Sequence, residues 1–162
     1  MKTATLFRWC LWAPFVALET DDSKIENLTK EMGTILGTLF QRSDDLLDFD
    51  VRNKEGKLVL GDLKSGYLNS FATYSTSEWS TEARLQLKTV ESLQEFKGLL
   101  GEKEFVEKVQ RFDSLNSNLI DLYDHHLGEL KALLPDSQSE LIENLKPLAD
   151  LLYWRGEKKG GA

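Results

Sequence analysis

The sequence predicts an all-α protein, and three observations support this fold class. Apolar residues recur at the three- and four-residue spacing of amphipathic helices through most of the 162 residues. No segment shows the sustained alternation of apolar and polar residues that marks half-buried strands. Only 11 Gly and 3 Pro interrupt the chain, and its 41% apolar and 29% charged residues are ordinary for a globular domain. We therefore expect a bundle of helices.

The first two predicted helices are separated by capping residues. One helix is expected over Thr3–Glu19, with a bend at Pro14, because proline lacks a backbone donor. The polar residues 20–22 supply caps for a second, long helix that ends near Asp48. Its apolar residues form one broad stripe, at positions 25, 28, 32, 35, 36, 39 and 40.

A glycine-punctuated loop is expected over Phe49–Gly66, after which the helical pattern resumes. Five further helices are predicted, over Tyr67–Tyr74, Ser80–Leu99, Glu102–Asp113, Leu115–Leu134 and Ser137–Trp154. No linker of biased composition suggests a second domain. We expect one partial domain over residues 1–155, followed by a frayed tail over 156–162.

Charge and composition exclude several classes of function. A net charge of −7 argues against nucleic acid as a partner, since Lys and Arg drive that binding. Cys10 is the only cysteine, so no intrachain disulfide can form, and a cytoplasmic location is expected. No apolar stretch has the length of a transmembrane segment. The apolar run Trp9–Leu18 is similar to a secretory signal, but no small-x-small cleavage site follows it.

Three aspartates lie at the end of the long predicted helix. Gln41, Asp44 and Asp48 project from one face because they are three and four residues apart, and Asp45 flanks them. Neighbouring carboxylates repel each other, and the helix dipole disfavours anions at this end. A hard cation such as Mg²⁺ would relieve both effects, since it prefers carboxylate, water and phosphate oxygens. On residue types alone, a solvated acidic helix end is the commoner interpretation.

The surroundings of the aspartates favour a site over a solvated helix end. Apolar residues at positions 39, 40, 46 and 47 flank them, which places the acidic stripe against a buried wall. Gly33 and Gly37 lie four residues apart earlier in the same helix. This spacing permits the backbone of a neighbouring helix to approach closely.

The segment Leu36–Asp48 resembles the second aspartate-rich motif of trans-isoprenyl diphosphate synthases, which combines Gly, Phe-Gln and Asp-Asp-x-x-Asp in this order. Lys2-Thr3 is similar to the Lys-Thr pair that precedes this motif in the family. Gly56-Lys57 and Asp62-Leu63 are similar to the loop that follows it. The resemblance covers essentially the whole chain. It implies the C-terminal half of the isoprenoid synthase helical bundle.

The resemblance also implies an activity, in which an allylic diphosphate condenses head-to-tail with isopentenyl diphosphate. The implied ligands of Mg²⁺ are Asp44, Asp45 and Asp48. The implied catalytic and substrate-binding residues, which contact phosphate oxygens, are Lys2, Thr3, Gln41 and Lys57. Magnesium and lysines neutralise the departing diphosphate, and the double bond of isopentenyl diphosphate attacks the allylic cation before a proton is lost. Taken singly, each of the two lysines is explained as an ordinary terminal or loop residue.

The sequence departs from the family in two places. The family carries a first aspartate-rich motif and paired arginines, and this chain has neither: Asp21-Asp22 lacks the third aspartate. Tyr67 follows Gly66, where the family commonly has a lysine. The neighbouring His125 and His126 could join a metal site, but we expect solvated surface histidines there.

Three functional hypotheses follow. The first is a prenyltransferase half-subunit, inactive alone, whose missing motif comes from a second polypeptide that is separately encoded or cleaved from the same precursor. Its exposed apolar surface would include Trp9, Trp12 and Phe15, because the missing half would normally cover it. The second is a non-catalytic regulatory or binding subunit of a polyprenyl diphosphate synthase. The third is a helical interaction protein that binds no ligand.

Overall fold

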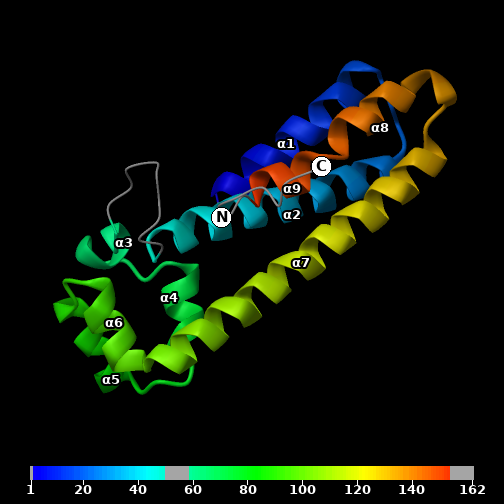
Figure 1. The fold of residues 1–162 in the computed structure, drawn as a ribbon. Coiled ribbons are helices and arrows are strands. Elements are labelled where there is room, and N and C mark those ends of the chain that lie inside the picture. The colour runs from blue at the N-terminus through cyan, green and yellow to red at the C-terminus, as the bar shows by residue number, and fades with distance from the viewer. Residues whose placement is uncertain (1, 50–58, 154–162) are drawn as a thin grey trace. The chain divides into compact units, whose positions relative to one another are not determined.

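Helices make up the regular structure of the described part of the chain, which confirms the predicted all-α class (Figure 1). The computed structural model describes residues 2–49 and 59–153, apart from the side chains of Lys2 and Ser139. Within these ranges there is no strand. The described residues form two compact units. The first unit comprises residues 2–41 and 115–153, and the second unit comprises residues 42–49 and 59–114.

The first two helices follow the predicted boundaries. Helix α1 spans Lys2–Ala17 and continues through Pro14. Helix α2 spans Ser23–Leu47. The Asp22 carboxylate accepts hydrogen bonds from two backbone N–H groups at the start of α2, at 2.8 and 3.3 Å. Asp22 therefore caps α2, as the sequence predicts.

Between α2 and residue 101, the described residues form five short helices. They are α3 (Gly61–Lys64), α4 (Ser70–Ser75), α5 (Thr81–Leu85), the 3₁₀ helix η1 (Gln86–Thr89) and α6 (Leu93–Leu100). Helix α3 lies within the segment predicted as a loop, and three elements replace the single helix predicted over residues 80–99. Side-chain caps explain this division, because the hydroxyls of Ser80 and Ser92 each accept a backbone N–H at 3.2 Å.

The long helix α7 spans Glu102–Leu133, where the sequence pattern predicts two helices. The predicted break at Asp113 and Ser114 is wrong, because the Ser114 hydroxyl donates to the Gln110 carbonyl at 3.1 Å and stays within the helix. The predicted last helix is divided as well, since Pro147 lacks the N–H that would continue it. Its place is taken by η2 (Asp136–Gln138), α8 (Ser139–Leu145) and α9 (Leu148–Leu152).

The core of the first unit joins side chains from α1, α2, α7, α8 and α9. Its most deeply buried large residues are Phe15, Met32, Leu36, Leu39, Tyr123 and Leu130. Figure 1 shows that α1 and the C-terminal helices α8 and α9 lie alongside α2. The stripe of apolar residues on α2 supplies the centre of this core, as its periodicity predicts.

Helices α1 and α2 approach each other closely at two glycines of α2. A Cβ atom added to Gly33 would lie 2.5 Å from the Cα of Arg8, and one added to Gly37 would lie 2.5 Å from the Cα of Ala4. Both distances are far below a normal contact, so only glycine fits at these positions. The predicted role of Gly33 and Gly37 in close helix packing is confirmed.

Tyr123 connects α7 to the end of α8, and its replacement by phenylalanine is expected to destabilise the protein by about 1–2 kcal/mol at neutral pH. The buried phenol donates a hydrogen bond to the carbonyl of Leu145 at 2.8 Å. Burial, with a smaller effect from the charge of Asp124, raises the pKa of Tyr123 above its ordinary value of 10.0.

This pKa direction gives the Tyr123→Phe variant a distinct pH dependence. The folded state holds the neutral phenol, so the stabilisation is complete below pH 10 and is lost as the pH rises above that value. Urea denaturation at pH 7 and at pH 11 should therefore show a smaller difference between wild type and variant at the higher pH. A difference that is constant across this range would contradict the assignment.

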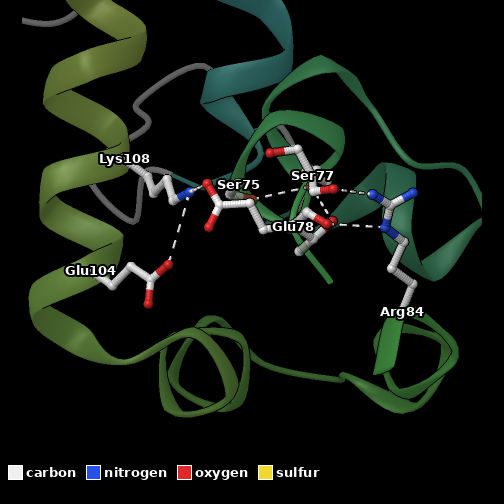
Figure 2. Close-up of polar contacts among 8 residues, drawn as sticks. Ser75, Ser77, Glu78, Arg84, Glu104 and Lys108 are labelled. Carbon is white, nitrogen blue, oxygen red and sulfur yellow. Dashed lines mark hydrogen bonds and ion pairs between the residues drawn. The ribbon is translucent and has the colours of Figure 1, made fainter. Parts of the chain in front are cut away.

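The second unit has an aromatic core. Phe71 contacts the rings of Phe49, Phe105 and Phe112, with centroid distances of 4.9, 5.9 and 5.5 Å. Figure 2 shows Lys108 of α7 between two acidic side chains of the same unit. Its ammonium group lies 3.7 Å from Glu78 and 3.9 Å from Glu104. These contacts tie α7 to the segment after α4.

Candidate functional site

Thr3 and Gln41, which are 38 residues apart in the sequence, come together in the first unit. The Thr3 hydroxyl donates to the Gln41 side-chain carbonyl at 3.4 Å, a long hydrogen bond between two half-buried groups. The close crossing of α1 and α2 at Gly37 places them side by side. The packing of two helices thus brings together two residues that are each predicted to contact phosphate.

The side chains of the two lysines that are predicted to contact phosphate are not described by the structure. Lys2 is the first residue of α1 and therefore precedes Thr3 at the start of the helix. Its side chain, and the whole of Lys57, lie outside the described residues. Their roles stay predictions.

The three aspartates of the cluster differ in exposure. Asp45 and Asp48 are buried, with 3% and 0% of their surface exposed, whereas Asp44 is partly exposed. The acidic stripe is therefore not a solvated helix end. This agrees with the prediction from the apolar residues that flank it. Asp44 is the carboxylate of the three that offers the most surface to a ligand.

Asp45 connects the end of α2 to the start of α4. Its carboxylate accepts a hydrogen bond from the backbone N–H of Ser70 at 2.8 Å. Its backbone carbonyl accepts another from the Asn69 side chain at 3.1 Å. Because a carboxylate at a helix N-terminus also interacts favourably with the helix dipole, Asp45 stabilises α4 in addition to any role toward a ligand.

Asp48 and Asp62 both lie within hydrogen-bonding distance of the side-chain amide of Asn69. The Asn69 side-chain nitrogen lies 3.1 Å from a carboxylate oxygen of Asp62 and 3.4 Å from one of Asp48. Asp48 also accepts the backbone N–H of Asp62 at 2.9 Å, and Asn69 caps α4 by accepting the N–H of Ala72 at 3.0 Å. We call Asp45, Asp48, Asp62 and Asn69 the aspartate hub.

Sequence reasoning missed Asn69. Its signal was local, because an asparagine directly before an apolar helical run is a common N-cap. Its second function, donating to carboxylates that lie 7 and 21 residues away, depends on the tertiary fold. Tyr67, where the sequence resemblance leads us to expect a lysine, is 71% exposed, and its N–H donates to the Asp62 carbonyl at 2.9 Å.

The described residues contain no group of three or more His, Cys, Asp or Glu side chains placed to hold a metal ion. Mg²⁺ does not require such a group, because it is usually bound by one or two carboxylates and completed by water and substrate phosphates. Asp44 suits that kind of site. Whether Asp45 and Asp48 act as ligands as well stays a prediction.

The two histidines of α7 differ from each other. The His125 side chain is exposed, as predicted. The prediction is wrong for His126, whose ring is mostly buried and lies 3.3 Å from carboxylate oxygens of both Glu31 and Glu129. These two acidic contacts explain why a polar ring is tolerated there.

Helix α1 carries an apolar face that the described residues leave uncovered. Leu6, Trp9 and Val16 share one side of the helix, and Trp9 is 71% exposed. We call these three residues the α1 face. The expectation that Phe15 belongs to such a surface is wrong, since it is only 1% exposed, and Trp12 is half-buried and stacks on it. No helix within the described ranges is long and apolar enough to cross a membrane.

Comparison with known protein families places most of the described helices within one family model. The family model described as "Polyprenyl synthetase" matches residues 1–108, which include α1, α2 and the whole aspartate hub. Neither a curated protein nor a solved structure matches the chain.

Proposed function

Because this chain belongs to the polyprenyl synthetase family, we propose that it binds the magnesium diphosphate of an allylic substrate for condensation with isopentenyl diphosphate. The family consists of prenyltransferases that use these two diphosphates and are generally Mg²⁺-dependent. In this proposal the chain corresponds to the C-terminal half of a synthase. Asp44 holds the metal, and phosphate oxygens are contacted by Lys2, Thr3, Gln41 and Lys57.

The pairing of Thr3 with Gln41 is the observation that carries this proposal. An interaction partner without a ligand site has no need to bring a hydroxyl and a carboxamide together beside a glycine contact. Both groups offer donors and acceptors suited to phosphate oxygens. Asp44 follows Gln41 by three residues on the same helix, so both belong to one short segment of α2.

The aspartate hub supports this proposal by fixing the end of α2. The hydrogen bonds of Asp45 and Asp48 to Asn69, Ser70 and Asp62 restrain the last turn, which carries Asp44. Bound Mg²⁺ would supply charge neutralisation for the departing diphosphate. Asp44 is half-buried, so part of its carboxylate surface is exposed. Asp45 and Asp48 restrain the backbone of the same helical turn.

A second polypeptide is the other part of the proposal. The 162 residues contain one Asp-Asp-x-x-Asp sequence and no Arg-Arg pair, so the first aspartate motif must come from elsewhere for turnover. The α1 face supports this, because α1 is apolar around much of its circumference and such helices are normally covered. Native mass spectrometry of the protein purified from its source tests whether such a partner is present.

A non-catalytic binding or regulatory subunit is the second candidate function. Tyr67 favours it, because an exposed phenol stands where the family commonly provides a cationic phosphate contact. A neutral phenol cannot neutralise diphosphate charge as an ammonium group does. Under this alternative the chain would still bind magnesium diphosphate.

Replacing Asp44 by alanine is expected to weaken Mg²⁺-dependent binding of an allylic diphosphate about 100-fold or more, because a direct carboxylate ligand is lost. Titration calorimetry with geranyl diphosphate and Mg²⁺ measures this. The matched control is Asp121→Ala, which removes an exposed carboxylate from α7. Equal affinities of the two variants would overturn the diphosphate site.

Turnover requires a separate test, because Asp44→Ala affects both candidate functions alike. The chain is combined with a partner that carries the first aspartate motif and lacks an intact second one. Prenyl diphosphate product formed by the pair, and by neither chain alone, supports the half-subunit. Binding without product supports the regulatory subunit.

A further inference from the structure

The second unit contains a pocket on the side of α5 and η1. Its volume is about 200 Å³. The walls come mainly from Leu63, Tyr67, Leu68, Leu85 and Leu87. Three of these, Tyr67, Leu68 and Leu85, are also among the exposed large apolar residues of the chain. Leu63 and Leu87 are buried, so both buried and exposed apolar side chains line the pocket.

Two cations belong to this pocket, Arg84 and Lys88. Within the part of the chain that the structure describes, no Asp or Glu lines it, although acidic residues outnumber basic ones in the chain, 27 to 20. The local charge is therefore opposite to that of the protein as a whole. Positive charge beside an apolar wall favours a ligand with one anionic end and one apolar end.

Arg84 is held in a fixed position. Its guanidinium donates to the carbonyl of Ser77 at 2.8 Å, as Figure 2 shows, and to the carbonyl of Thr76 at 3.0 Å. These bonds use two of the five N–H donors of the group, which leaves donors for a further acceptor. Lys88 is exposed, and among the described residues it makes no ion pair.

We propose that this pocket is a second binding site, for a short hydrocarbon chain that ends in a phosphate or diphosphate group. The apolar walls would contact the hydrocarbon, and Arg84 and Lys88 would contact the phosphate oxygens. Because cationic side chains supply the charge, this site needs no Mg²⁺. That property separates it from the site proposed at Asp44.

The size of the pocket limits its ligand. A volume of about 200 Å³ is below the range of roughly 300–1,000 Å³ that is usual for drug-sized ligands. A short chain fits, and a longer one would extend through the open side. The family's own diphosphates have the required chemistry, and their phosphate suits a preformed guanidinium.

Titration of the full chain with geranyl diphosphate in excess EDTA tests the proposal. Binding is expected in EDTA, and geraniol, which lacks the anionic end, is expected to bind at least about tenfold more weakly. Octanoate distinguishes a general anionic amphiphile from a phosphate ligand. Tighter binding of octanoate than of geranyl diphosphate would overturn the choice of phosphate.

Two variants locate the site. Lys88→Glu reverses a charge of the pocket, and Leu85→Glu places a carboxylate on its exposed apolar wall; each is expected to weaken binding in EDTA about tenfold or more. The matched control is Lys103→Glu, an equal charge change at a largely exposed side chain of α7. Circular dichroism confirms that the variants are folded.

Asp44→Ala separates this proposal from the proposed function. It is expected to remove Mg²⁺-dependent binding and to leave binding in EDTA unchanged. No binding in EDTA, or binding that Lys88→Glu and Leu85→Glu leave intact, overturns the second site without affecting the first. If Asp44→Ala abolished binding of geranyl diphosphate in EDTA, all binding would be assigned to the aspartate segment. This result would also overturn the second site.

Discussion

Replacing Gly37 by alanine is expected to lower the free energy of unfolding by about 2–3 kcal/mol, although alanine is the better helix former. The new methyl group would lie 2.5 Å from the Cα and 2.9 Å from the nitrogen of Ala4. Both are backbone atoms, which cannot rotate away as a side chain could. Relief therefore requires α1 to move off α2, and this exposes part of the first unit's core. Urea denaturation followed by circular dichroism measures the loss.

Gly128→Ala is the matched control for this prediction. Gly128 lies in α7 within the same unit, and an added Cβ would meet no atom of the described residues within 4 Å. Alanine there is expected to stabilise the protein by about 0.4–1 kcal/mol, because it restricts the unfolded chain and favours helix. If both variants changed stability in the same direction, the close contact at Gly37 would not be a feature of the protein in solution.

Replacing Asn69 by aspartate is expected to cost about 3 kcal/mol or more in stability, although the two side chains have almost the same shape. The amide donates to Asp62 and Asp48 and to the Asp45 carbonyl. A carboxylate cannot donate these bonds, and it would place a fourth carboxyl group beside those of Asp45, Asp48 and Asp62. Denaturation measurements give the size of the loss, and hydrogen exchange in α4 locates it.

Asn118→Asp provides the comparison for Asn69→Asp. Asn118 is exposed on α7, so the same chemical change there removes no buried donor. Its expected effect is within about 0.5 kcal/mol of zero. A similarly small effect of Asn69→Asp would mean that the aspartate hub is not a structural element, and that its carboxylates are available for other roles.

The features that the sequence predicted correctly depend on short stretches of chain. The cap at Asp22 involves residues two and three positions away, and the apolar stripe of α2 follows from helical periodicity. The close contact at Gly33 and Gly37 was predictable because two glycines four residues apart leave one face of a helix without side chains. The division of the segment after residue 80 had a local signal as well, the Ser-x-x-Glu capping box at Ser92, which was overlooked.

The features that were missed depend on tertiary contacts or on a choice between local alternatives. Residue types near Ser114 favour a helix break, and only its bond to Gln110 shows that the hydroxyl stays within α7. Phe15 and Trp9 lie on a helix that is apolar on most sides, so the sequence could not say which of them faces the core. The burial of Asp45 and Asp48 follows from contacts with residues 14 to 25 positions away.

The sole thiol of the protein lies close to the α1 face. Cys10 is exposed and follows Trp9 directly on α1. A maleimide dye would therefore attach at one known position, and the neighbouring indole would influence its fluorescence. A polypeptide that covers the α1 face would slow the labelling reaction and change the emission of a dye already attached. The chain thus carries its own reporter for assembly, which needs no engineered residue and works even if the assembled complex forms no product.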